Sequence, residues 1–148
     1  MKITTSLLFA VSLFALATAS DAAAATVPAG TRLVVRTLNT ITSSDATGTR
    51  LHTELMGNIT AQGRVVLPAG TKINGRVVSS RRLASSKDRL SVDLTEVIIG
   101  GRSHAIRTTG PVHPVNFTTS RGVSVTRGFY TFASGKTITF HLGQPLTF

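Results

Sequence analysis

The stretch VPAGTRLVVR at residues 27–36 returns 40 positions later as LPAGTKINGR at residues 67–76. Both copies read apolar-Pro-Ala-Gly-Thr-basic-apolar-x-x-Arg. The proline and the glycine suit a type I turn, and the alternating residues after the threonine suit a β-strand. Two copies are too few for a solenoid. The repeat therefore predicts two equivalent corners, with Gly30 and Gly70 in matching places, in one small β-barrel or sandwich.

The rest of the chain after residue 25 also consists of strand patterns separated by turn residues. No sustained helical period occurs there, and the basic stretch 79–88 (SSRRLASSKD) is expected to form a loop or a short helical turn. We therefore predict an all-β fold of about eight short strands. We expect a strand over 50–59 and a turn at 61–64. A further strand is expected over 89–99, with Leu90, Val92, Leu94 and Ile98 on one face, and a Gly100-Gly101 hairpin should lead from it into 103–108. The final expected pair is formed by 123–132 and 136–142 around a turn at 133–135.

Aromatic residues are confined to the last third of this region, since none occurs between Thr26 and Asn116. The duplicated region must therefore have an aliphatic core. We expect the C-terminal strands to cover that core with their rings, each of which buries about 150–250 Å².

Residues 1–25 have the pattern of a secretory signal peptide. Lys2 gives a positive start, and the apolar run 7–17 is too short to cross a bilayer, which needs roughly 20 residues. Ala-x-Ala sites end at Ala19, Ala24 or Ala25; an N-terminal membrane anchor is the alternative interpretation. We predict a cleavable signal helix (1–25), a single β domain (26–148) and a periplasmic or secreted protein that does not insert across the membrane.

The chain has no Cys and no Trp, so disulfides and thiolate metal sites are excluded. Its formal net charge is +10, and removal of the signal peptide takes away one cation and one acid, Lys2 and Asp21. Nucleic acid is one anionic partner that such a charge suggests. It is the less favoured one, because the most basic stretch lacks aromatic rings for stacking and no basic helix is visible. Envelope proteins with acidic surfaces and anionic envelope polymers fit better, and a role in solubility alone is the remaining alternative.

Groups that could converge for catalysis are few. Asp93 and Glu96 are an odd number of residues apart, which predicts opposite faces of one strand. The four histidines show no metal-binding spacing, although His52 and Glu54 share a strand face and could form a two-ligand metal edge. We therefore predict no enzymatic activity and no cofactor, with a small secreted hydrolase as the minor alternative.

The repeat also places charge. Arg32 and Arg36 share one face of the first strand, and Lys72 and Arg76 take the same positions in the second. Each pair spans about 13 Å at ~3.3 Å per residue. These four cations are the predicted site for an anionic partner.

Several motifs occur in a fixed order: PAGT at 28–31, Leu38, Ser43, Gly48, PAGT at 68–71, Gly75, Arg89-Leu90 and Gly100-Gly101. Over residues 27–110 this order resembles the C-terminal β-barrel domain of TrbI-type conjugal-transfer proteins, which are scaffold subunits of type IV secretion systems. The resemblance implies a β domain in the cell envelope that assembles into a ring near the outer membrane. The family's helical hairpin has no counterpart in the short, Pro-containing stretch 110–122. The sequence thus predicts an exported structural or interaction protein of the envelope. The alternative is an anionic-polymer or DNA-binding accessory factor of an envelope or secretion assembly. An oligomer is compatible with the resemblance.

The signal peptide can be tested directly. We expect the mature protein to begin after Ala19, Ala24 or Ala25, because these residues end the Ala-x-Ala sites. N-terminal sequencing of the protein purified from its native compartment measures this. Recovery of intact Met1 on a membrane-embedded protein would show an anchor instead.

Overall fold

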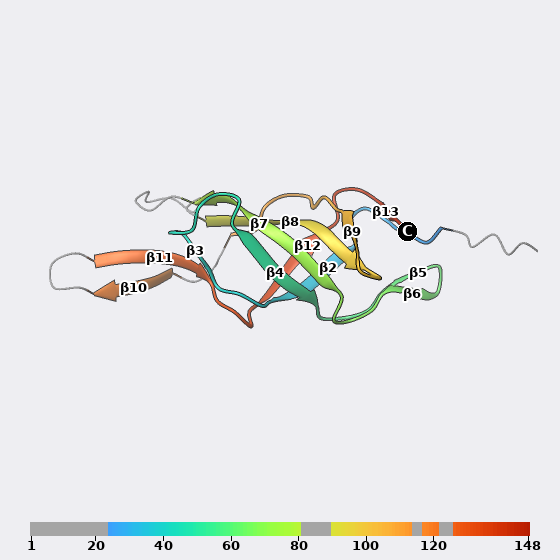
Figure 1. Cartoon of the computed structure of the whole chain (residues 1–148), viewed down its shortest axis with the longest axis horizontal. Coiled ribbons are helices and arrows are strands. Elements are labelled where there is room, and N and C mark those ends of the chain that lie inside the picture. Colours follow the sequence, from blue (N-terminus) through green and yellow to red (C-terminus); the bar gives the residue numbers. More distant parts are fainter. Residues whose placement is uncertain (1–23, 81–89, 114–116, 122–125) are drawn as a thin grey trace, which may run out of the picture.

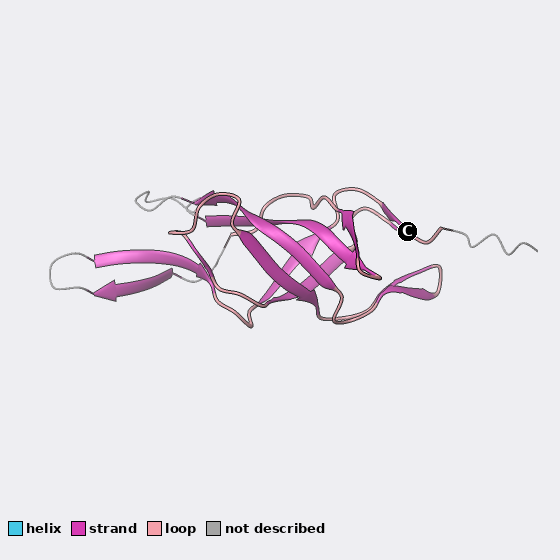
Figure 2. Cartoon of the chain, in the orientation of Figure 1, coloured by secondary structure: helices cyan, strands magenta, loops and turns pink. Residues whose placement is uncertain are grey.

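The computed structural model describes residues 24–80, 90–113, 117–121 and 126–148. All regular elements in these ranges are β-strands, which confirms the predicted all-β class (Figure 2). The predicted signal helix lies outside the described residues. Within them, no helix is long and apolar enough to cross a bilayer. The described residues contain thirteen strands, which is more than the predicted number of about eight, and three of them contain only two residues.

The centre of the fold is an antiparallel six-stranded sheet that curls into a half-barrel (Figure 1). Both repeat strands belong to it and are separated by one intervening strand. In spatial order the strands are β12 (Thr137–His141), β2 (Arg32–Thr37), β4 (Arg50–Leu55), β7 (Lys72–Ser80), β8 (Leu90–Ile99) and β9 (Arg102–Ala105).

The two edges of this sheet meet beyond the ends of β9 and β12. There the Thr109 amide donates to the His141 carbonyl at 2.9 Å, and the Gly143 amide donates to the Arg107 carbonyl at 2.7 Å. These bonds flank an isolated antiparallel bridge between Thr108 and Leu142. The open side of the half-barrel is therefore bridged by backbone hydrogen bonds.

The remaining strands form three smaller sheets. Figure 1 shows hairpins β10–β11 and β5–β6 projecting from opposite ends of the molecule. The smaller sheets consist of β1 (Thr26–Val27) with β13 (Leu146–Thr147), β5 (Ile59–Ala61) with β6 (Arg64–Leu67), and β10 (Phe117–Arg121) with β11 (Thr126–Phe132) and β3 (Ile41–Thr42).

Two predicted strand assignments were wrong. The run over 50–59 is divided into β4 and β5, because the Leu55 carbonyl at the end of β4 accepts from the Gly70 amide of the second corner. The predicted pair of 123–132 with 136–142 does not form: β11 pairs with β10 and β3, and β12 pairs with β2. The cause is Thr37 at the end of β2, whose hydroxyl donates to the Ala133 carbonyl at 2.6 Å and so holds the 133–135 turn against β2.

The two repeat corners are equivalent, as predicted. Gly30 and Gly70 have φ angles of 83° and 85°. In each corner the following threonine hydroxyl donates to the proline carbonyl at 2.7 Å. The turn type was predicted incorrectly, since a positive φ at the third of the four turn residues defines type II rather than type I. Glycine adopts this conformation without a Cβ clash.

The core is aliphatic in the duplicated region and is completed by rings from the C-terminal strands, as predicted. The buried side chains include Leu33, Val35, Leu51, Leu55, Ile73, Val77, Phe132 and Phe140. On β8, Val97 is buried in place of the predicted Ile98. A register shift opposite Asn74 and Gly75 inserts one extra residue into β8 and reverses the alternation there.

The same shift corrects the predicted placement of the β8 acids. Asp93 pairs with Arg76, and Glu96 pairs with Asn74. Arg76 and Asn74 are two residues apart on β7 and share a face. Asp93 and Glu96 therefore lie on the same face of the sheet rather than on opposite faces.

Substitution of the corner glycines tests their conformation. We expect Gly30→Val and Gly70→Val each to lower the free energy of unfolding by about 1–2 kcal/mol, because a β-branched residue is strained at positive φ. Gly57→Val is the control, since Gly57 has no positive φ and a Cβ there meets nothing within 4 Å. Thermal melts followed by circular dichroism measure the difference. Equal losses in all three variants would contradict the strain argument.

Candidate functional site on the outer face of the sheet

The four predicted cations all lie on the outer face of the curled sheet. Arg32 and Arg36 on β2, and Lys72 and Arg76 on β7, are exposed, while the residues between them alternate into the core. β4 runs between these two strands, so its outward residues Arg50, His52 and Glu54 share the face. The alternation of the repeat was therefore sufficient to predict the exposure of the four cations.

Glu54 neutralises part of this charge. It lies directly opposite Arg36 on one side and Lys72 on the other. Arg36 donates to Glu54 Oε1, and Lys72 Nζ donates to Oε2 at 3.0 Å. The hydrogen bond from Arg36, followed by that from Lys72, holds the pKa of Glu54 below its ordinary value. Two of the four predicted cations thus share one carboxylate, which sequence reasoning missed because the repeat does not reveal which strand lies between its copies.

A second polar row crosses the face next to this triad. Asn74 donates from Nδ2 to Glu96 Oε1 at 2.8 Å, which turns its oxygen toward His52 Nδ1 at 3.0 Å. The hydroxyl of Ser103 donates to the other Glu96 oxygen at 2.5 Å. The hydrogen bonds from Ser103 and then Asn74 lower the pKa of Glu96. This row links β4, β7, β8 and β9 through side chains.

This row and the Glu54 triad bear on the metal hypothesis. His52 and Glu54 do share the outer face, as predicted. His52 is bonded to Asn74, however, and Glu54 is bonded to two cations. Within the described residues, no group of three or more potential ligands gathers that could hold a metal ion.

A third row contains two arginines. Arg50 on β4 lies directly opposite Arg76 on β7, and Asp93 on β8 follows on the far side of Arg76. Asp93 accepts a hydrogen bond from the Thr108 hydroxyl. Among the residues that the structure describes, no ion pair involves Arg50 or Arg76. No sequence pattern indicated this pair, because it depends on the register of two strands.

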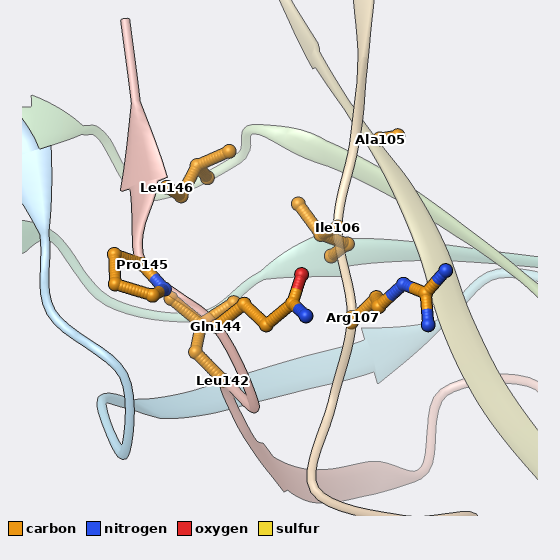
Figure 3. Close-up of a pocket in the computed structure, with 7 residues that line it drawn as sticks. All are labelled: Ala105, Ile106, Arg107, Leu142, Gln144, Pro145 and Leu146. Atoms are coloured by element: carbon orange, nitrogen blue, oxygen red, sulfur yellow. The ribbon is translucent and has the colours of Figure 1, made fainter.

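A small pocket of about 140 Å³ lies elsewhere, where the segments after β9 and β12 diverge. Residues 105–107 line one side, and Leu142 and residues 144–146 line the other (Figure 3). The side chains of Ile106, Leu142 and Leu146 form its apolar part, and Gln144 extends toward the segment that carries Arg107 (Figure 3). Arg107 is the one titratable residue in this lining, so the lining residues offer no acid and base pair.

Comparison with known proteins shows a similarity of fold. No protein-family model matches the chain, and no curated protein matches it. The structure is similar to that of ComB10 of the Com type IV secretion system of Helicobacter pylori, with a TM-score of 0.56. The match covers 84% of this chain and 90% of that chain at 13% sequence identity. The chain therefore has a fold related to that of a type IV secretion component, which agrees with the fold implied by the sequence resemblance.

The Glu54 triad makes a prediction about acid stability. The folded pKa of Glu54 lies below its ordinary value of 4.5, so its charged pairs stabilise the fold above that pH. This contribution is lost as the pH falls through the lower, folded pKa. We expect Glu54→Gln to be less stable than the parent at neutral pH and to lose less stability on acidification below pH 4.5. Urea unfolding at a series of pH values measures this, and parallel pH profiles for the two proteins would contradict it.

Proposed function

We propose that this chain is an exported, non-catalytic structural or interaction protein of the cell envelope, of the TrbI type that serves secretion and conjugal-transfer assemblies. The observation that carries this proposal is the fold shared with a secretion-system component over 84% of the chain. The ordered Pro-Ala-Gly-Thr motifs support the more specific relationship, because both motifs form equivalent corners of the sheet.

Export is proposed from the first 25 residues. β1 begins at Thr26, directly after the last Ala-x-Ala site, and the Ala25 carbonyl accepts from the Phe148 amide at 3.2 Å. Cleavage after Ala19 or Ala24 would keep this bond between the two ends of the domain. The mature domain would then act in the periplasm or outside the cell.

The proposed partner is an envelope protein with an acidic surface or an anionic envelope polymer. Arg32, Arg36, Lys72 and Arg76 share the outer face, and Glu54 offsets one of their four charges. A positive field therefore persists over β2 and β7, and such a field attracts anions. Nucleic acid remains the less favoured partner, and a self-assembled ring is compatible with this arrangement.

A cell-fractionation experiment tests both parts of the proposal. We expect the parent protein in the envelope or periplasmic fraction, cross-linked to a partner by an in-cell reagent. The quadruple variant Arg32→Gln, Arg36→Gln, Lys72→Gln and Arg76→Gln should be exported equally, since all four changes lie outside the predicted signal peptide. It should be released from isolated envelopes at a lower salt concentration than the parent. Fewer cations attract the variant to the envelope, and salt screens that attraction.

The outcomes separate the two parts. Retention of the parent in the cytoplasm would overturn the envelope assignment. Equal release of parent and variant at two ionic strengths would return the four cations to a role in solubility. Circular dichroism of both proteins controls for folding.

A further inference from the structure

Arg50 and Arg76 are like-charged residues that lie directly opposite each other on neighbouring strands. Hydrogen bonds join Thr49 to Val77 and Leu55 to Thr71 across β4 and β7. Because hydrogen-bonded and non-hydrogen-bonded pairs alternate in an antiparallel ladder, the pair of Arg50 and Arg76 is a non-hydrogen-bonded one. The Cα atoms of such pairs are only about 4.5 Å apart. Two exposed arginine side chains therefore extend from adjacent backbone positions on the outer face.

Within the described residues, the surrounding acids form no ion pair with these two arginines. Like charges directly opposite each other destabilise a sheet, and four residues away along the same strands Glu54 is placed between Arg36 and Lys72. Around Arg50 and Arg76, by contrast, the acids of β8 are hydrogen-bonded to other groups, although Asp93 lies opposite Arg76. Asp93 accepts from Thr108, and Glu96 accepts from Asn74 and Ser103. Glu96 and Arg50 attract each other through space but form no ion pair within the described part of the chain.

The backbone beneath the pair is held in place on both sides. Asn39 Nδ2 donates to the Arg50 carbonyl at 3.0 Å, and Asn39 Oδ1 accepts from the His52 amide at 2.8 Å. On the other side, the Val77 amide donates to the Thr49 carbonyl at 2.9 Å. The backbone from which both side chains extend is thus held in place before any ligand binds, which lowers the entropy cost of binding.

We propose that Arg50 and Arg76 form a binding site for a phosphate group. A phosphate has oxygens on several sides, so two guanidinium groups can each donate to it in a bidentate manner. The bound anion would also remove the repulsion between the arginines. This inference rests on the proposed function, because it names the chemistry of the anionic partner. The phosphate belongs either to a lipid headgroup or to a free phosphate, and two arms of one experiment distinguish them.

The test compares Arg50→Gln/Arg76→Gln with Arg64→Gln/Arg102→Gln. The control pair removes the same charge from exposed positions on β6 and β9, outside the proposed site. In the first arm, melting temperature is followed against inorganic phosphate, with chloride of equal ionic strength as reference. In the second, binding is measured to vesicles of phosphatidylcholine with and without phosphatidylglycerol.

We expect the parent and the control to respond to phosphate in at least one arm, with affinity falling about fivefold or more in Arg50→Gln/Arg76→Gln alone. A response to vesicles only would assign the phosphate to a lipid, and a response to inorganic phosphate would assign a free phosphate. The double change removes the repulsion between the arginines and also their attraction to Glu96 and Asp93. Folding of Arg50→Gln/Arg76→Gln is therefore checked separately, by a circular dichroism spectrum and a cooperative melt without phosphate.

Other results overturn the site. These are no response of the parent in either arm, an equal loss in the control, or an unchanged response in Arg50→Gln/Arg76→Gln. If the parent still binds envelopes in a salt-dependent manner in any of these cases, the proposed function stands and only this site is wrong. If the parent does not bind envelopes either, the proposal of an anionic partner is also wrong.

Discussion

The register of β4 between the two repeat strands is the constraint on which the rest of the structure depends. It places Leu51 and Leu55 in the core and, by alternation, Arg50 and Glu54 on the outer face. A slip of one residue would exchange these faces and bury the charges. The same register brings Glu54 between Arg36 and Lys72 and places Arg50 opposite Arg76. Core packing and surface chemistry are thus set by one pairing.

Local chemistry explains which features could be predicted from the sequence. The Gly30 and Gly70 corners and the Gly100-Gly101 hairpin depend on neighbouring residues, so their motifs were informative. The bulge in β8 and the departure of β12 to pair with β2 depend on distant contacts, such as Thr37 with Ala133. At the candidate site, alternation predicted that Arg32 and Lys72 are exposed. It could not show which groups lie beside them, because that requires the order of the strands.

The similarity to ComB10 concerns the fold alone. A TM-score of 0.56 at 13% identity means that the same path of the chain is reached with mostly different residues. Turn glycines and alternating apolar residues can specify such a path with many sequences. Outward residues such as His52, Asn74 and Glu96 are not required by the fold, so their hydrogen-bonded row has to be explained from this chain alone.

The pairing of β1 with β13 has a kinetic consequence. Thr26 and Thr147 hydrogen-bond across 121 residues of sequence, and β2 likewise needs β12 as its neighbour. Contacts this distant form slowly, because a long loop has to close first. The domain therefore cannot complete its sheet until the last strands have been synthesised. Until then β1 lacks its partner β13 and β2 lacks its neighbour β12, so the growing chain cannot reach its native fold.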